Sequence, residues 1–282
     1  MEQQQILSPA SSPRPNLLGP DPEVRVIGHR GASGVAPENT LAAVAAAVRC
    51  GARYIEVDVQ LSADGVPFIF HDETGRRTTN IAEVFPRRAR RPITTFTWAE
   101  LQRLEVGSHF SAAFAGERIA HLDEVRDAVH GQCGLFIEIK NPKNSPGIEA
   151  ALAERLTNDM KWVDVVRRHG VEVLGFDARS NREFARLAGH IPVQQLTRSV
   201  PSKRALTRIE QYAQAIGVNY RALDERGARR LRRSSLDFGV YTVNGPRAVS
   251  NAVARGATRI TTDWPQRVAE QLQRRTPGPP HN

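Results

Sequence analysis

The sequence predicts an α/β fold, a (β/α)8 TIM barrel with a small insertion, on three observations. Short apolar segments of strand type recur along the chain, helical patterns lie between many of them, and polar residues follow the apolar segments. Strands that alternate with helices favour a parallel sheet, and about eight such units in roughly 250 residues are typical of a barrel. The alternative is an open doubly wound sheet, but GHRGASG (28–34) lacks the GxGxxG spacing of its dinucleotide-binding turn.

Nine segments fit a strand pattern, although a barrel has eight places for them. They are RVIGHRG (25–31), YIEVDV (54–59), PFIFHD (67–72), LFIEIK (135–140), EVLGFD (172–177), PVQQLT (192–197), IGVNY (216–220), GVYTVN (239–244) and RITTDWP (259–265). We expect one of them not to be a strand, and PVQQLT and IGVNY are the weakest candidates. The step from YIEVDV to PFIFHD departs from a regular barrel, because LSADG (61–65) is too short for a helix.

Helical patterns occupy residues 40–51, 122–130, 149–168 and 246–255. In the first of these, Leu41, Val44 and Val48 lie on one face. Asn39 is expected to cap its N-terminus, and Gly51 is expected to take a left-handed conformation after its last turn.

A single domain is expected over residues 24–273, with no Gly/Ser linker to divide it. Residues 73–120 contain no strong strand and are interpreted as an insertion after the strand that ends at His71. Residues 1–23, rich in Pro, Ser and Gln, and residues 274–282 are expected to be a disordered leader and tail.

The charge of the chain is strongly positive, with a net charge of +9 and a pI of about 10.3. Two arginine runs, RRARR (87–91) and RGARRLRR (226–233), contribute to it. Such a surface attracts anions, including phosphate-bearing substrates and anionic membranes. Neither run carries an aromatic stacking pattern or zinc-finger spacing, so no specific nucleic-acid partner is expected, whereas a weak membrane contact stays open.

The sequence lacks the patterns of a membrane span, of a secretory signal and of a CxxC motif, and we use these absences to predict its location and the state of its cysteines. The chain has no run of 18 apolar residues, and residues 1–22 lack the apolar region of a secretory signal. We therefore expect a cytoplasmic protein without a transmembrane segment. Cys50 and Cys133 lie in no CxxC pattern and are expected to be buried free thiols.

Three carboxylates point to a metal site. Glu56 and Asp58 share one face of a predicted strand, and Glu138 takes an equivalent place in LFIEIK. Buried like charges repel one another unless a cation joins them, and an all-oxygen set favours Mg²⁺ or Ca²⁺. The alternative is that Glu56 and Asp58 pair with arginines in a buried network.

Two histidines and two basic residues complete the predicted site. His29 and His71 lie at strand ends beside the carboxylates, where a pair of imidazoles suits a reaction with one general base and one general acid. Arg30 and Lys140 would make the pocket attractive to phosphate, unless each only balances a neighbouring acid.

These residues resemble a known family. GHRGASGVAPENT (28–40), IEVDVQLSADGVPFIFHDETGRRTTN (55–80) and IEIK (137–140) are similar to the glycerophosphodiester phosphodiesterases. The resemblance implies a TIM barrel and hydrolysis of glycerophosphodiesters to glycerol 3-phosphate and an alcohol. It also implies a metal at Glu56, Asp58 and Glu138, acid–base work by His29 and His71, and phosphate contacts from Arg30 and Lys140.

The same resemblance places Glu38 and Asn39 in a loop near the metal. Many relatives have Trp where this chain has Tyr241, a position that resembles a substrate-facing wall, and Ser where it has Gly175. These departures affect the expected alcohol specificity.

For the reaction, His29 is the favoured base, and the attacking hydroxyl is either water or the glycerol 2-hydroxyl of the substrate. Three other functions are open. The first is a phospholipase D-like or sphingomyelinase D-like activity on lysolipids with the same site. The others are a non-catalytic binding protein and a nucleic-acid binder that uses the arginine runs.

Overall fold

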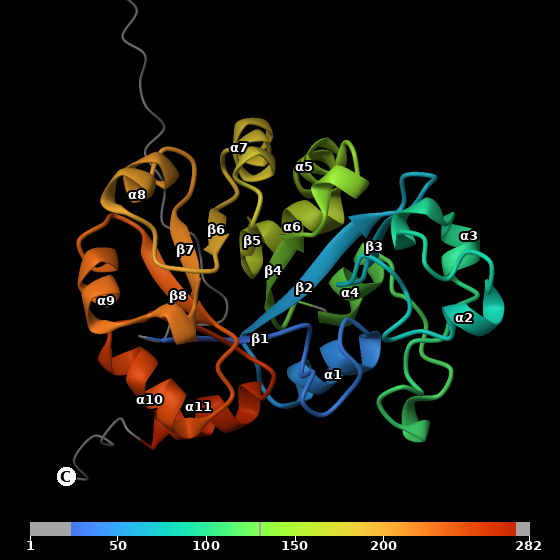
Figure 1. Ribbon diagram of the computed structural model, residues 1–282, viewed down its shortest axis with the longest axis horizontal. Coiled ribbons are helices and arrows are strands. Elements are labelled where there is room, and N and C mark those ends of the chain that lie inside the picture. Colours follow the sequence, from blue (N-terminus) through green and yellow to red (C-terminus); the bar gives the residue numbers. More distant parts are fainter. Residues whose placement is uncertain (1–23, 130, 275–282) are drawn as a thin grey trace, which may run out of the picture.

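A closed ring of eight parallel strands forms the centre of the computed structural model, which describes residues 24–129 and 131–274 (Figure 1). The leader predicted for residues 1–23 and all of the predicted tail except Arg274 lie outside the described residues. The barrel strands are β1 (Arg25–Gly28), β2 (Tyr54–Leu61), β4 (Gly134–Ile139), β5 (Val171–Gly175), β6 (Val193–Thr197), β7 (Ala215–Asn219), β8 (Asp237–Tyr241) and β9 (Arg259–Thr262). Because β1 pairs in parallel with both β2 and β9, the sheet closes. The predicted TIM barrel is confirmed, and the open sheet is excluded.

The ninth strand lies outside the barrel. All nine predicted segments contain strands, so the expectation that one of them is not a strand was wrong. The extra strand is β3 (Pro67–Ile69), which pairs antiparallel with the end of β2 through Val59↔Ile69. A five-residue connection cannot hold a crossover helix, so the chain can only return antiparallel. The two segments judged weakest, PVQQLT and IGVNY, contain β6 and β7 of the barrel wall.

Helices cover the outside of the barrel (Figure 1). They are α1 (Leu41–Arg49), α4 (Leu122–Val129), α5 (Ile148–Asn158), α6 (Met160–Arg168), α7 (Ala178–Leu187), α8 (Lys203–Ile209), α9 (Glu225–Leu231), α10 (Pro246–Ala254) and α11 (Pro265–Gln273). In the described part of the chain, no helix is long and apolar enough to cross a membrane.

Two helix predictions need correction, and both corrections come from capping side chains. The single helix expected over 149–168 is two helices, because Asp159 is extended and its carboxylate accepts the N–H groups of Lys161 and Trp162. The N-cap of α1 is Thr40, whose hydroxyl accepts from Ala43, rather than Asn39. Gly51 takes the predicted left-handed conformation at φ +73°.

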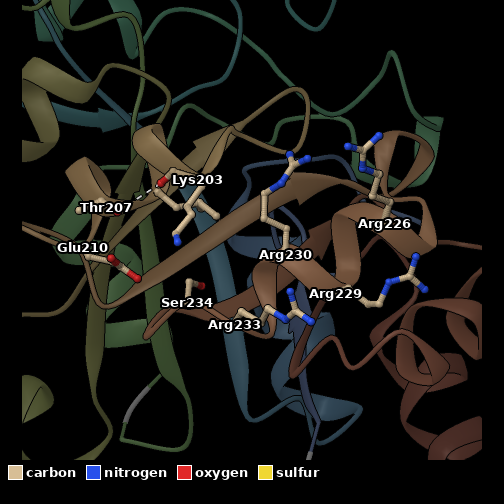
Figure 2. A pocket seen from close by; sticks show the side chains of 9 residues that line it. Lys203, Thr207, Glu210, Arg226, Arg229, Arg230, Arg233 and Ser234 are labelled. Carbon is tan, nitrogen blue, oxygen red and sulfur yellow. Dashed lines mark hydrogen bonds between the residues drawn. The ribbon is translucent and has the colours of Figure 1, made fainter.

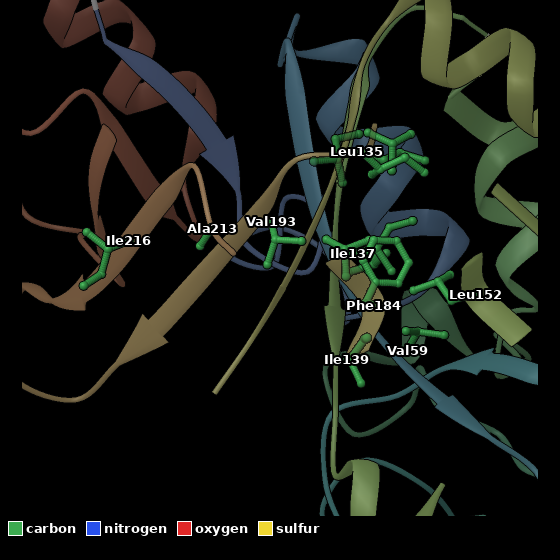
Figure 3. Close-up of a cluster of buried hydrophobic side chains, with 14 of the residues drawn as sticks. Val59, Leu135, Ile137, Ile139, Leu152, Phe184, Val193, Ala213 and Ile216 are labelled. Atoms are coloured by element: carbon green, nitrogen blue, oxygen red, sulfur yellow. The ribbon is translucent and has the colours of Figure 1, made fainter. Parts of the chain in front are cut away.

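Alternation along the strands separates two layers of side chains. Outward residues such as Ile137 and Val193 pack with helix residues such as Phe184 in the main core (Figure 3). Inward residues form a second cluster inside the barrel, made of Ile27, Tyr54, Phe136, Leu174, Leu196 and the partly buried Tyr241. Each fully buried large apolar side chain contributes about 1.5–3 kcal/mol. The polar side chains on the same inward faces lie beside this inner apolar cluster.

Residues 73–120 form a subsidiary unit of short helices beside β3. It contains α2 (Ile81–Val84) and α3 (Trp98–Leu101), with 3-10 turns at Ile93–Thr95 and Ala112–Phe114. Further 3-10 turns follow β4 and β7, at Pro142–Asn144 and Tyr220–Ala222. The unit has an apolar cluster of its own, which includes Phe96 and Leu104. Arg88 of the first arginine run contacts Glu100 at 2.5 Å and lies over the ring of Phe96, so it has a packing role.

Candidate active site

The predicted site residues gather at the carboxyl end of the barrel. His29 and Arg30 follow β1, Glu56 and Asp58 lie inside β2, and Lys140 follows β4. The register of the sheet pairs Asp58 with Glu138 on the neighbouring strand β4. Carboxyl ends of parallel barrel strands open toward one mouth, which explains why these groups converge.

The three carboxylates form a tight buried cluster. One oxygen from each of Glu56, Asp58 and Glu138 lies within 4.8 Å of the others, and all three residues are buried. Burial, followed by repulsion from Asp58 and Glu138, raises the pKa of Glu56 well above its usual range. Burial raises the pKa of Glu138 to about 7. Burial alone would also raise the pKa of Asp58, but Lys140 and Arg30 outweigh it and hold that pKa low.

Neighbouring cations neutralise part of this cluster. Lys140 Nζ lies 2.5 Å from Glu138 Oε1 and 3.2 Å from Asp58 Oδ1, and Arg30 Nε lies 3.3 Å from Asp58 Oδ2. The alternative that Glu56 and Asp58 pair with arginines therefore describes Asp58, which contacts Arg30. It does not describe Glu56, which has no ion pair with a described residue.

Glu56 provides the test of whether a metal ion fits. Its Oε2 accepts the backbone N–H of Arg30 at 2.8 Å, but its Oε1 is buried without a hydrogen-bond partner among the described residues. Buried polar atoms are normally satisfied. Two cations beside three carboxylates also leave one negative charge. The oxygen donors and the unpartnered Oε1 fit a hard divalent cation.

The loop after β1 has an unusual backbone, and it orients the carboxylate cluster through the side chain of Asn39. Arg30 and Asn39 both have left-handed backbone conformations, at φ +54° and +55°, which are costly for residues other than glycine. Asn39 Nδ2 donates to Asp58 Oδ2 at 2.8 Å, and Asn39 Oδ1 accepts the N–H of Asp58 at 3.1 Å. This double contact explains why Asn39 does not cap α1.

His29 is oriented by a carboxylate from the other end of the chain. Its Nδ1 lies 2.6 Å from Asp263 Oδ1. Asp263 also accepts from Ser33 Oγ at 3.0 Å and from Asn244 Nδ2 at 2.5 Å. Burial lowers the pKa of His29, and Asp263 offsets part of that effect. Because Nδ1 is engaged, Nε2 is the ring atom left for proton transfer.

His71 reaches the site through the hairpin formed by β2 and β3. The N–H of Phe70 donates to the carbonyl oxygen of Asp58 at 2.9 Å, which brings the next residue to the carboxylate cluster. The Nδ1 of His71 lies 2.6 Å from Asp72 Oδ1. His71 and His29 thus have the same arrangement, a half-buried imidazole held at Nδ1 by a carboxylate.

A chain of ion pairs links this second histidine to the carboxylate cluster. Arg77 Nε donates to Asp72 Oδ2 at 2.7 Å, and Arg77 Nη2 donates to Glu38 Oε1 at 2.6 Å. Glu38 also accepts from Arg30 Nη1 at 2.6 Å, and Arg30 contacts Asp58. Glu38, predicted only as a loop residue, therefore bridges the two arginines.

Tyr241 lies at the barrel mouth, where its ring packs edge-on against Phe176 at 5.8 Å between centroids. Its hydroxyl donates to the carbonyl oxygen of Thr197 at 2.7 Å. Burial and the charge of Glu138 raise the pKa of Tyr241 to about 12, so the ring is a neutral wall. Phe176 is 38% exposed and lies 5.7 Å from Lys140 Nζ, a position that makes it part of the same wall.

Sequence reasoning missed Asp263, Arg77 and Phe176, and it placed Asp72 at the strand end beside His71 without giving it a role. Asp72 follows His71 directly, so its adjacency was an available signal. Asp263 lies 234 residues from His29, and no local pattern could pair the two.

Comparisons with known proteins identify the family of the chain and support its fold. The family model described as "Glycerophosphoryl diester phosphodiesterase family" matches residues 29–267. A glycerophosphodiester phosphodiesterase of Caldanaerobacter subterraneus is 33% identical over 245 residues, which cover 86% of this chain and 94% of the relative. One of Bacillus subtilis is 29% identical over 266 residues, 89% of this chain and 86% of the relative. A solved phosphodiesterase of Oleispira antarctica, in complex with the product sn-glycerol-3-phosphate, is similar with a TM-score of 0.75 at 25% identity. That similarity covers 88% of this chain and 96% of the other.

Proposed function

The chain belongs to the glycerophosphoryl diester phosphodiesterase family, and on that basis we propose a specific chemistry for its site. As a glycerophosphodiester phosphodiesterase, it hydrolyses glycerophosphodiesters to glycerol 3-phosphate and an alcohol. His29 and His71 act as general base and general acid, and Glu56, Asp58 and Glu138 hold one divalent cation.

One observation carries this proposal. Two imidazoles, each held at Nδ1 by a carboxylate 2.6 Å away, stand beside a buried cluster of three carboxylates at the mouth of one barrel. Hydrolysis of a phosphodiester needs a proton removed from the attacking hydroxyl and a proton given to the leaving oxygen. The two free Nε2 atoms supply these two roles.

His29 is the better base. Burial lowers its pKa, so its Nε2 is unprotonated near neutral pH and can accept the proton of the attacking hydroxyl. Asp263 then stabilises the imidazolium that forms. As the new P–O bond forms, the bond from phosphorus to the alcohol oxygen breaks, and His71 donates its Nε2 proton to that oxygen. The attacking hydroxyl is water or the glycerol 2-hydroxyl; in the second case a cyclic phosphate forms, and water then opens it to glycerol 3-phosphate.

Arg30 and Lys140 hold the phosphate. Both side chains are mostly buried and already lie beside the carboxylates, so little conformational entropy is lost when an anion binds. Their charges stabilise the additional negative charge on the phosphoryl oxygens in the transition state. Tyr241 provides an apolar wall for the organic part of the substrate.

The cation belongs at the oxygen cluster. When bound there, Mg²⁺ or Ca²⁺ supplies Lewis acidity toward a phosphate oxygen and lowers the pKa of an adjacent hydroxyl. The residues that hold it are Glu56, Asp58 and Glu138, oriented by Asn39 and by the backbone of Arg30.

The test is hydrolysis of glycerophosphocholine, followed as glycerol 3-phosphate, with EDTA and then with Mg²⁺ or Ca²⁺ restored. We expect activity to vanish with EDTA and to return with one ion. His29→Asn and His71→Asn should each lower kcat about 10²–10⁴-fold. The control is His109→Asn, an exposed histidine of the insertion, which should leave kcat unchanged. A His71→Asn protein with normal kcat would contradict the assignment.

Activity on lysolipids is the alternative, and it needs an apolar path for an acyl chain. Phe176 is the exposed large apolar residue that follows β5 at the mouth. Parallel assays with lysophosphatidylcholine and glycerophosphocholine separate the two functions. The substrate with the higher kcat/KM identifies the activity of the site.

A further inference from the structure

A basic groove lies between α8 and α9 on the outside of the barrel, and none of its residues belongs to the mouth (Figures 1 and 2). Its volume is about 460 Å³. Its charged lining, which we call the α8–α9 groove set, consists of Lys203, Arg226, Arg229, Arg230, Arg233 and Glu210. The second arginine run of the sequence therefore lines a concavity.

Most of the positive charge in the groove is not compensated by the protein. Lys203, Arg226 and Arg233 have no carboxylate partner within residues 24–129 and 131–274. Arg229 has only a loose contact with Glu225, at 3.4 Å. The carboxylate of Glu210 already accepts the N–H of Ser235 at 2.9 Å.

One arginine of the set gives the groove a fixed wall. Arg230 Nη1 donates to the carbonyl oxygen of Pro201 at 2.9 Å, which ties α9 to the residues just before α8. Arg226 and Arg229 lie three residues apart on α9, so their like charges share one helix face, and Arg233 lies in the turn that follows the helix. Like charges on one helix face are destabilising unless an anion offsets them.

The first arginine run makes a useful contrast. In that run, Arg88 pairs with Glu100 and packs over the ring of Phe96. The other arginines, Arg87, Arg90 and Arg91, are exposed. A planar membrane surface would meet the rims of a groove such as the one between α8 and α9, whereas a compact anion could enter it. Guanidinium forks bind phosphate oxygens in pairs.

We propose that the α8–α9 groove set binds a small ligand with two or more phosphate groups, at a site separate from the barrel mouth. Several linked phosphates match five cations spread over α8, α9 and the turn after α9 better than one phosphate does. This inference does not depend on the catalytic mechanism.

The experiment is calorimetric titration of the metal-free full-length protein with tripolyphosphate, pyrophosphate and phosphate. The test variant is R226Q/R229Q/R233Q, which keeps Arg230 and its contact with Pro201. The control is R87Q/R90Q/R91Q, which removes the same charge from the other run. Unfolding midpoints of both variants equal to that of the wild-type protein establish that folding is intact.

We expect tripolyphosphate to bind most tightly and phosphate most weakly. The groove variant should weaken tripolyphosphate binding by about tenfold or more, and the control by less than about threefold. Raising the salt from about 0.01 M to about 0.1 M should weaken binding, since the screening length falls from about 30 to about 10 Å.

Three results would overturn the proposal. The first is an equal loss in both variants, which would mean attraction to net charge alone. The second is phosphate binding as tight as that of tripolyphosphate. The third is groove-dependent retention on anionic lipid vesicles or duplex DNA with no binding of tripolyphosphate, which would assign the groove to a macromolecular surface.

Discussion

Asp263→Asn tests whether the carboxylate behind His29 matters for proton transfer. Asparagine keeps the volume of aspartate, but it removes the charge that faces Nδ1 of His29 at 2.6 Å. Its amide can also present an NH₂ group to the ring, which favours the wrong tautomer for a base at Nε2. Asp263 lies outside the predicted metal cluster, so the cation site should be unaffected.

The size of the effect follows from the contact that is lost. Hydrogen bonds to charged groups are worth about 1.5–3 kcal/mol. Since 1.4 kcal/mol is a factor of ten, kcat/KM should fall about 10–150-fold. Asp263 also raises the pKa of His29 against the effect of burial, so its removal should move the acidic limb of the pH profile to lower pH.

The assay is kcat/KM for glycerophosphocholine across pH 4–9 with saturating cation. Ser33→Ala is the matched control, because it removes a neutral 3.0 Å contact to the same carboxylate and should cost only about two- to tenfold. An Asp263→Asn protein within about twofold of wild type, with an unmoved acidic limb, would refute the idea that Asp263 positions a catalytic His29.

Further predictions concern the metal cluster and the thiols. Glu138 has a folded pKa of about 7, above its usual 4.5, so the stability this group provides to the metal-free protein is complete below pH 4.5 and is lost as the pH rises through 7. Thermal unfolding in chelator should show stability falling by on the order of 1 kcal/mol per pH unit between about pH 5 and 7, and Mg²⁺ or Ca²⁺ should cancel this fall; a flat profile would contradict the prediction. Glu56→Gln should stabilise the metal-free protein at pH 8 and abolish the shift in unfolding midpoint caused by the cation, whereas a lower midpoint in chelator would argue against repulsion at this site. A thiol reagent at pH 8 should label the half-buried Cys50 before Cys133, which is 1% exposed and has a pKa raised by burial to about 12; equal labelling rates in the native protein would disprove its burial.

Several features of the fold were predictable because they depend on neighbours along the chain. The capping role of Gly51 and the start of α4 follow from the local sequence. The split between α5 and α6 was not predicted, because the apolar pattern continues through Asp159 and only the cap interrupts it. Asn39 was assigned to the wrong role, because its side-chain amide donates to Asp58 and does not cap α1.

Some residues of the candidate site were likewise predictable from the local sequence. Period-two alternation along two short segments was enough to place Glu56, Asp58 and Glu138 on inward faces, because a strand directs every second side chain to the same side. Proximity in sequence was also enough to associate His29 and Arg30 with the first strand end.

Only the tertiary structure determined which residues, distant in the sequence, come into contact with these site residues. The closure of β1 against β9 brings Asp263 to His29, and the antiparallel return of β3 brings His71 to the carboxylates. The basic groove likewise exists only because α8 and α9 lie side by side. The sequence by itself determined the barrel, its inward carboxylates and its family, because these depend on short-range periodicity and motif spacing. The pairing of His29 with Asp263 depends on how the ring closes, and the shape of the groove depends on how α8 and α9 pack; both involve contacts between residues far apart in the chain.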